Sequence, residues 1–196
     1  FKRTWVSPEG GIYMSLILRP RLEPLNTARI TLCAAVTVAE AIRAVTGLEA
    51  SIKWPNDILI NGLKVCGILT EMKAQQDELD FVILGIGINA DTDKSKLPEG
   101  ATSLIAELGG TVSKVGLARQ VLELFEILYK KLENNFDEII EAWRKLSVTL
   151  GSRVKTSAHG KIIEGQAMDI DENGGLIVRL DNGFSRHILS GDVEQM

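Results

Sequence analysis

Residues 51–69 read SIKWPNDILINGLKVCGIL, and this stretch determines how the centre of the chain is built. A short strand over 50–54 meets a turn at Pro55-Asn56, and residues 57–60 resume as a second apolar strand. The pair Asn61-Gly62 then predicts a two-residue hairpin, because such a turn needs positive φ at both central positions. The stretch therefore predicts antiparallel strands that follow one another directly.

The same pattern continues on both sides of this stretch. Strands are expected over 12–18, 64–71 and 79–88, with a polar turn at 75–78. A long helix is expected from Asn26 or Thr27 to about Thr46, with Gly47 as its stop. Its predicted apolar side consists of Ile30, Cys33, Ala34, Val38, Ala41, Ile42 and Val45. Further helices are expected over 101–109, 113–134 and 137–146.

The composition changes after Gly151, where polar and apolar residues alternate and turns are frequent. Four or five short strands in about 45 residues are typical of a small β-barrel. The fold class predicted is α+β: a central antiparallel or mixed sheet with packed helices over 1–150, then a small barrel over 151–196. The domain boundary is expected near Leu150.

Composition and charge exclude several function classes. The chain has 196 residues, of which 45% are hydrophobic, and a formal net charge of −4, which argues against a general affinity for nucleic acid or anionic membranes. No signal peptide is visible, and no apolar run reaches the roughly 18 residues needed to span a bilayer. Cys33 and Cys66 are predicted to be buried free thiols, which favours a reducing cytoplasm. His159 and His187 are expected at the surface, and no metal site built by the protein is predicted.

Three central segments carry the residues suited to chemistry. The Pro-Asn turn could aim Lys53 and Asp57 at a site on the sheet, although a simple turn with Trp54 in the core would look the same. Lys64 enters an apolar strand that contains Gly67, a residue that often marks close approach of a ligand. The run Gly85-Ile86-Gly87-Ile88-Asn89 leaves one strand face without side chains. That face suits a flat ligand, or a crowded packing of the sheet.

The first residues add a possible nucleotide contact. Arg3 and Trp5 precede Ser7-Pro8-Glu9-Gly10-Gly11. An indole beside cationic residues can stack on a base while the arginine meets phosphate. The competing interpretation is a tryptophan packed against its own loop.

Together these segments resemble biotin protein ligases. The resemblance is carried by RTWVSPEGGIYMSLIL, KWPNDI, LKVCGIL, GIGIN followed by GATSL, and the strand-rich tail after Leu150. It covers essentially the whole chain and implies a catalytic domain followed by an SH3-like barrel. It also implies that biotin and ATP are joined as biotinyl-5'-AMP, with Mg²⁺ carried by the ATP, and that biotin then passes to a lysine of a carboxylase carrier domain.

The resemblance assigns roles to individual residues. Lys64 matches the catalytic lysine, which would bridge the biotin carboxylate and the phosphate, and Asp57 would accept a proton from the incoming lysine amine or orient it. Lys53 would be a supporting cation or a structural residue. Biotin would be held by Lys64, Gly67, Leu69, Gly85 and Arg3, and the nucleotide by Trp5, Asn89 and Lys53.

The resemblance also leaves alternatives open. Only the end of the family's Gly-x-Gly-Arg loop is present, at Phe1–Trp5, so a longer parent protein is expected and this chain alone is expected to be incomplete. Nucleic-acid binding would need a helix-turn-helix in that missing part, and dimers are common in the family. The competing functions are a lipoate-type acyl ligase, a regulatory protein that binds biotinyl-adenylate without turnover, and a docking module for the carrier over 150–196.

Overall fold

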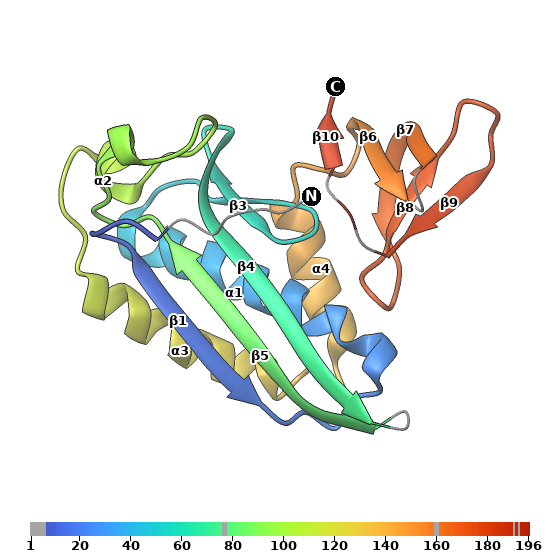
Figure 1. Ribbon diagram of the computed structural model, residues 1–196, viewed down its shortest axis with the longest axis horizontal. Coiled ribbons are helices and arrows are strands. Elements are labelled where there is room, and N and C mark those ends of the chain that lie inside the picture. Colours follow the sequence, from blue (N-terminus) through green and yellow to red (C-terminus); the bar gives the residue numbers. More distant parts are fainter. Residues whose placement is uncertain (1–6, 76–77, 159–160, 190, 192) are drawn as a thin grey trace.

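The computed structural model describes residues 7–75, 78–158, 161–189, 191 and 193–196. Two antiparallel sheets make up its framework, and helices cover one face of the first sheet (Figure 1). The predicted α+β class is therefore confirmed, and both sheets are antiparallel throughout the described part of the chain.

The first sheet has five strands in the order β1-β5-β4-β3-β2. Its strands are β1 (Ile12–Leu18), β2 (Ser51–Lys53), β3 (Asp57–Ile60), β4 (Leu63–Gln75) and β5 (Glu78–Ile88). The predicted hairpin joins β3 to β4, with φ of 51° at Asn61 and 78° at Gly62. These two residue types accept positive φ readily, so the local sequence sets the turn and the turn sets the strand pairing.

The helical layer is built around α1, which packs against both α3 and α4. The helices are α1 (Ala28–Thr46), α2 (Leu104–Leu108), α3 (Lys114–Tyr129) and α4 (Phe136–Leu146), with short 3-10 turns at Pro24–Asn26 and Lys94–Lys96. Gly47 ends α1 in the left-handed conformation, as predicted. The predicted apolar side of α1 is buried except Val45, which is 40% exposed. That prediction was wrong because Val45 lies in the last turn of the helix.

The second sheet follows α4 and has the order β10-β6-β7-β8-β9. Its strands are β6 (Arg153–Ala158), β7 (Lys161–Ile170), β8 (Leu176–Arg179), β9 (Ser185–Ile188) and β10 (Val193–Gln195). In the described residues the two outer strands do not pair with each other, so the sheet is open and the predicted barrel is not confirmed.

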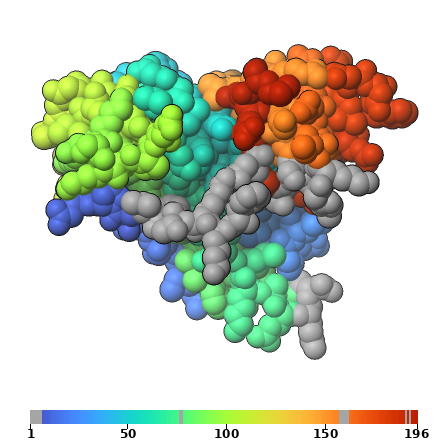
Figure 2. All heavy atoms as spheres, turned by 45° about the horizontal axis from the view of Figure 1, so that its top comes forward, coloured from blue at the N-terminus to red at the C-terminus, as the bar shows by residue number. Residues whose placement is uncertain are grey.

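Hydrogen bonds from β2 and the turn after it join the two sheets. The backbone N–H of Trp54 donates to Thr149 Oγ1 at 2.9 Å, and its indole N–H donates to the Gly174 carbonyl at 3.0 Å. On the helical side, Arg144 of α4 binds both carboxylate oxygens of Asp169 in β7, at 2.8 and 2.9 Å. In space, the β3–β4 hairpin lies between residues 90–110 on one side and the second sheet on the other (Figure 2).

Within the ranges given above, no helix is both long enough and apolar enough to cross a membrane. Cys33 and Cys66 are both buried and free, as the sequence predicted.

Candidate functional site

One row of residues crosses all five strands of the first sheet. Cross-strand pairing places Tyr13 opposite Gly87, Gly87 opposite Gly67, Gly67 opposite Asp57, and Asp57 opposite Lys53. Residues paired in this way project from the same face of a sheet. Their neighbours in the chain are buried on the helical side, so the row lies on the face without helices. Two glycines at its centre leave the backbone bare between an aromatic ring and a carboxylate.

An irregularity in β4 adds Lys64 to this face. Regular alternation would turn Lys64 and Gly67 to opposite sides, since they are three residues apart. The pairing shifts between Ile58 and Leu59, so that Ile58 faces Cys66 while Leu59 faces Lys64, and Val65 is left as the extra residue of a bulge. Bulges commonly re-aim a side chain beside a functional site. Here the bulge brings Lys64 to the face that carries Asp57.

A cavity of about 370 Å³ lies over the glycine-bared part of the row. We call it the site cavity. Its wall comes from β1, β3, β4, β5 and the loop before α2, through Tyr13, Asn56, Asp57, Lys64, Cys66, Gly67, Ile68, Leu69, Gly87, Asn89, Leu97, Pro98 and Ala101. Lys64 and Asp57 are its charged residues. The cavity therefore offers one cation and one anion above an otherwise apolar floor.

Lys64 and Asp57 form an ion pair, with Nζ 2.5 Å from Oδ1. The two side chains are 41% and 24% exposed, so water and a ligand can still reach them. The backbone of Lys64 is held more tightly than its side chain. Its N–H donates to the Gly100 carbonyl at 2.9 Å, and its carbonyl accepts from the N–H of Thr102 at 2.8 Å.

Asn89 closes the end of β5 against the same loop. Its side-chain N–H donates to the Thr102 carbonyl at 3.0 Å, and its backbone N–H donates to the Val65 carbonyl at 2.8 Å. Among the described residues its amide oxygen accepts no hydrogen bond. Within the described ranges, this oxygen is therefore an acceptor at the cavity wall that no donor occupies.

A second hollow of about 230 Å³ continues along the bare face, lined by Tyr13, Met14, Ser15, Leu69, Glu71, Ile83, Gly85 and Ile86. Tyr13 and Leu69 line both spaces, so they stand at the junction. The hydroxyl of Tyr13 donates to the Pro8 carbonyl at 2.8 Å, which fixes the ring there. Together the two hollows form a slot with a mainly apolar floor, with Glu71 at the wall of the second hollow and the Lys64–Asp57 pair at the wall of the site cavity.

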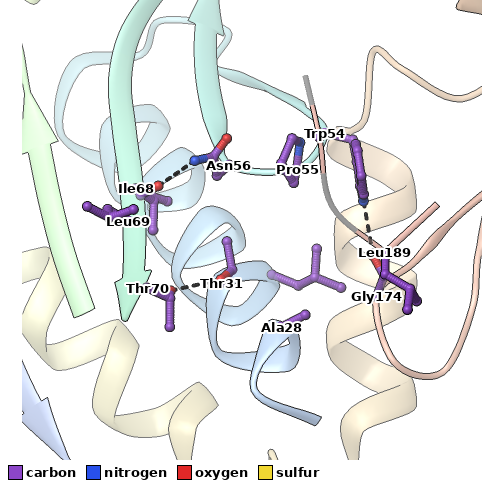
Figure 3. A pocket seen from close by; sticks show the side chains of 12 residues that line it. Ala28, Thr31, Trp54, Pro55, Asn56, Ile68, Leu69, Thr70, Gly174 and Leu189 are labelled. Atoms are coloured by element: carbon purple, nitrogen blue, oxygen red, sulfur yellow. Dashed lines mark hydrogen bonds between the residues drawn. The ribbon is translucent and has the colours of Figure 1, made fainter. Parts of the chain in front are cut away.

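A third space, the inter-sheet pocket, lies where β4 meets the second sheet (Figure 3). It measures about 230 Å³ and shares Asn56, Ile68 and Leu69 with the site cavity. Asn56 is fixed by two bonds to Ile68: its side-chain N–H donates to the Ile68 carbonyl at 2.6 Å, and its own carbonyl accepts from the Ile68 N–H at 3.0 Å. These two bonds fix the Pro-Asn turn between the inter-sheet pocket and the site cavity.

Cys66 lies directly behind the charged pair. Burial raises the pKa of its thiol, the nearby Lys64 cation lowers it, and the Asp57 carboxylate raises it again. The thiol therefore stays protonated, and we assign it no role in chemistry.

The structure brings most of the predicted site residues together. Lys64, Asp57, Gly67, Leu69 and Asn89 line the site cavity, and Gly85 lines the second hollow. Lys53 shares their face beside Asp57 without lining either space. Arg3, Trp5 and His159 lie outside the described residues. His187 is 57% exposed, and its ring lies 3.0 Å from Asp171.

Sequence reasoning missed Tyr13, Asn56, Leu97 and Pro98 as wall residues. Side chains alternate between the two faces of β1, and Tyr13 is on the face that pairs with the glycines of β5, so this pattern could have indicated Tyr13. The sequence around Leu97 and Pro98 carried no such signal. No group of three or more His, Cys, Asp or Glu suited to a metal occurs in the described ranges.

Comparisons with known proteins place this arrangement in a family. Residues 1–89 match the model of the biotin/lipoate A/B protein ligase family, and residues 149–195 match that of the biotin protein ligase C-terminal domain. A bifunctional ligase/repressor BirA from Bacillus spizizenii is 39% identical over 198 residues, which cover 98% of this chain and 61% of that protein. The chain thus spans about three fifths of that relative.

Two further relatives are covered more fully. A biotin–[acetyl-CoA-carboxylase] ligase from Paracoccus denitrificans is 33% identical, over 90% of this chain and 77% of the relative. The solved structure of a biotin protein ligase from Aquifex aeolicus, in complex with biotin and ATP, is 31% identical with a TM-score of 0.84, covering 99% of this chain and 82% of that one. On sequence and fold alike, this chain belongs to the biotin protein ligase family.

Proposed function

We propose that the protein activates biotin with ATP to give biotinyl-5'-AMP and then transfers biotin to a lysine of a carboxylase carrier domain. One observation carries the proposal: a single lysine cation, Lys64, lies at the wall of a mainly apolar slot over a sheet surface bared by Gly67, Gly85 and Gly87. Two relatives support it, since the Aquifex ligase was solved with biotin and ATP and the Paracoccus enzyme is named for acetyl-CoA carboxylase.

The first step brings two anions together. The biotin carboxylate attacks the α-phosphorus of ATP, a P–O bond forms, and the bond to pyrophosphate breaks. Two unit charges about 4 Å apart repel by roughly 4 kcal/mol at an effective dielectric of 20. The Lys64 ammonium, placed between carboxylate and phosphate, offsets this repulsion and stabilises charge that develops in the transition state. Magnesium belongs to this proposal as the ion that ATP carries, bound through phosphate oxygens and one or two protein oxygens.

The second step needs a neutral amine. The carrier lysine attacks the acyl carbon of biotinyl-adenylate, a C–N bond forms, AMP leaves, and the amine loses a proton. Asp57 is proposed to orient that amine or take its proton, from its place opposite Gly67 in the row. Because Asp57 pairs with Lys64, the residues proposed for the two steps lie at the same place in the site cavity.

Other groups complete the substrate sites in this proposal. The bicyclic ring of biotin fits the slot over Gly67, Leu69 and Gly85, and Arg3 is proposed to contact it. The amide oxygen of Asn89 faces the nucleotide, Trp5 stacks on adenine, and Lys53 supplies a second cation near Asp57. The residues with no described structure, Arg3 and Trp5, enter on the family resemblance alone.

The tail is proposed to be an SH3-like barrel domain over 151–196, separate from a catalytic domain over 1–150. The match of residues 149–195 to a family model supports this division. The buried free thiols suit a reducing cytoplasm as the place of action.

A competition assay tests the function. The full-length protein is offered biotin or lipoate with [α-³²P]ATP and Mg²⁺, and the acyl-adenylate is separated from ATP. We expect biotinyl-adenylate with biotin only, followed by release of labelled AMP as a purified biotin carboxyl carrier domain becomes biotinylated. Lipoyl-adenylate as the main product would favour a lipoate-type ligase. Bound biotinyl-adenylate with no transfer would favour a regulatory binding protein.

A further inference from the structure

We propose that Glu107 is a positioning residue for adenylate formation, which it serves by fixing the backbone that carries Lys64. The inference rests on the proposed function and extends it to a residue outside the cavity wall. Glu107 is in α2, a five-residue helix that follows the loop over the site cavity.

The carboxylate of Glu107 joins two segments that are distant in the chain. One oxygen accepts from the Thr102 hydroxyl at 2.6 Å, and the other accepts from the Asn61 side-chain N–H at 2.7 Å. Thr102 is fully buried and Asn61 is exposed in the turn between β3 and β4, so the Glu107 carboxylate joins a buried hydroxyl to a surface amide.

With the backbone, these two bonds make a closed path of contacts that includes Lys64, which we call the ring around Lys64. It runs along the chain from Asn61 to Lys64, by a backbone bond to Thr102, and through Glu107 back to Asn61. Asn61 begins the turn that leads into β4, and Lys64 follows three residues later. Thr102 in turn donates its backbone N–H to the Lys64 carbonyl at 2.8 Å, next to the Gly100 carbonyl that accepts from the Lys64 N–H. Glu107 is the one side chain among the described residues that binds both the turn and the loop. Without it, β4 and the loop would be held together here by backbone bonds alone.

The charge of Glu107 suits this role. The hydrogen bond from Thr102 is the main reason that the pKa of its carboxyl lies below the usual value. Burial opposes this effect, and the weaker contributions of the bond from Asn61 and the nearby Lys94 cation lower the pKa further. An ionised carboxylate only accepts hydrogen bonds, and both of its partners here are donors. Bonds to an ionised acceptor are stronger than those between neutral groups.

A displaced Lys64 would affect chemistry more than binding. The ammonium must sit between two reacting anions, and misplacement of a catalytic group by about 1 Å can cost on the order of 100-fold in rate. In the proposed mode the rings of biotin contact the floor of the slot, away from the Glu107 bonds, and only the biotin carboxylate meets Lys64. The expected signature is therefore a fall in kcat for adenylate formation with little change in the KM for biotin.

A reversal of donor and acceptor provides the test in the full-length protein. Asn61→Asp sets a second carboxylate against Glu107 and removes that bond. Glu107→Gln keeps both bonds once the exposed Asn61 amide turns its oxygen toward the Gln N–H, but a neutral amide replaces the ionised acceptor. In the double variant Asn61→Asp/Glu107→Gln, the Gln N–H donates to Asp while its oxygen still accepts from Thr102, so both bonds return. Glu126→Gln is the matched control, because Glu126 also accepts a side-chain bond, from Lys130 on the distant helix α3.

We expect Asn61→Asp to lower kcat for adenylate formation about tenfold, Glu107→Gln to lower it less, and the double variant to return to within about twofold of the unaltered protein. The KM for biotin and the thermal unfolding midpoint should change little. A double variant as slow as the two single changes combined, or a fall in kcat that tracks the unfolding midpoint, would overturn the inference. Absence of adenylate in the unaltered protein would instead refute the proposed function, and the two failures are thus distinct.

Discussion

Lys64 Nζ lies 2.5 Å from Asp57 Oδ1 across neighbouring strands, although the other eleven residues in the wall of the site cavity carry no charge. The pair has two consequences. The ammonium is already held in place before any substrate arrives, and an incoming carboxylate or phosphate must share it with Asp57. A lysine with a carboxylate partner is better positioned than a free one, at the cost of weaker attraction for the first anion.

Replacement of Lys64 by alanine should lower adenylate formation by at least about 100-fold, because the repulsion between carboxylate and phosphate is no longer offset. Single-turnover formation of biotinyl-adenylate measures this directly. Lys73→Ala is the matched control, since Lys73 is also in β4 and also pairs with an aspartate, Asp80, at 3.4 Å. Equal rates for the Lys64 and Lys73 variants would remove Lys64 from the mechanism.

Asp57→Asn should separate the two half-reactions. The amide keeps the size of the side chain but cannot accept the proton of the carrier lysine, so transfer from pre-formed biotinyl-adenylate should fall by about 100-fold or more. Adenylate formation should fall by less than tenfold, since Lys64 keeps its charge. Rapid mixing of isolated adenylate complex with a carrier domain gives the transfer rate. A variant that transfers normally yet activates poorly would reverse the assignment.

Gly85→Ala tests the slot for biotin. A Cβ at this position would meet the Leu69 carbonyl at 3.5 Å and the Leu69 Cβ at 3.9 Å, which are ordinary contacts, so the fold should accept it. The added methyl group projects into the second hollow and should raise the KM for biotin about tenfold or more. Gly110→Ala is the control, because nothing lies within 4 Å of a Cβ there. Unchanged biotin affinity in the Gly85 variant would show that biotin binds elsewhere.

Two buried tryptophans allow one hydrogen bond between the sheets to be measured. Trp54 is 1% exposed and its indole N–H donates to the buried Gly174 carbonyl (Figure 3), whereas the indole N–H of the fully buried Trp143 meets no acceptor in the described structure. Both Trp→Phe changes shrink a core side chain, but only Trp54→Phe leaves a buried carbonyl unpaired. We expect it to lower the free energy of unfolding by about 1–3 kcal/mol more than Trp143→Phe does.

Urea titrations of the two variants supply the comparison. A larger loss of unfolding free energy in Trp143→Phe than in Trp54→Phe would contradict this expectation.

The two thiols predict a loss of stability in alkali. Burial raises the pKa of Cys33 to about 12, despite a hydrogen bond with Thr37, and it also raises that of Cys66. The unfolded thiols ionise near pH 9 while the folded ones do not, so their contribution is complete below pH 9 and is lost as pH rises above it. Each thiol can remove up to about 1.4 kcal/mol per pH unit in that range.

Denaturant titrations between pH 8 and 10.5 test this effect, with Cys33→Ala/Cys66→Ala as the reference. A thiol reagent should label Cys33 and Cys66 in the native protein only as fast as the protein opens and exposes them. Fast labelling at pH 8 under native conditions would be inconsistent with buried thiols.

The sequence predicted the local elements well where chemistry is local. Asn61-Gly62 accepts the positive φ of a tight hairpin, and Gly47 ends α1 for the same reason. The alternating glycines of GIGIN predicted a bare strand face, and both Gly85 and Gly87 lie on that face. These predictions depend on the conformational preferences of single residues or on period-two alternation, both of which can be read from the chain.

Predictions that depend on distant contacts were less complete. The pairing of Lys64 with Asp57 requires the bulge at Val65, which no residue type in LKVCGIL signals. Glu107 falls within the helix expected over 101–109 and received no role there, because its partners Asn61 and Thr102 reach it only through the tertiary fold. The tail was predicted to be a closed barrel from its strand count, but closure depends on a pairing of outer strands that short strands do not specify.

The bulge at Val65 also restricts how this region can evolve. One residue inserted or deleted between Asn61 and Gly67 would have to be absorbed by the bulge, or it would exchange the two faces for every position beyond it. Relatives that differ in length should therefore place their gaps at the opposite end of the sheet, near the connection of β4 to β5. Aligned family members with frequent single-residue gaps inside NGLKVCG would show that the lysine can reach its place by another route.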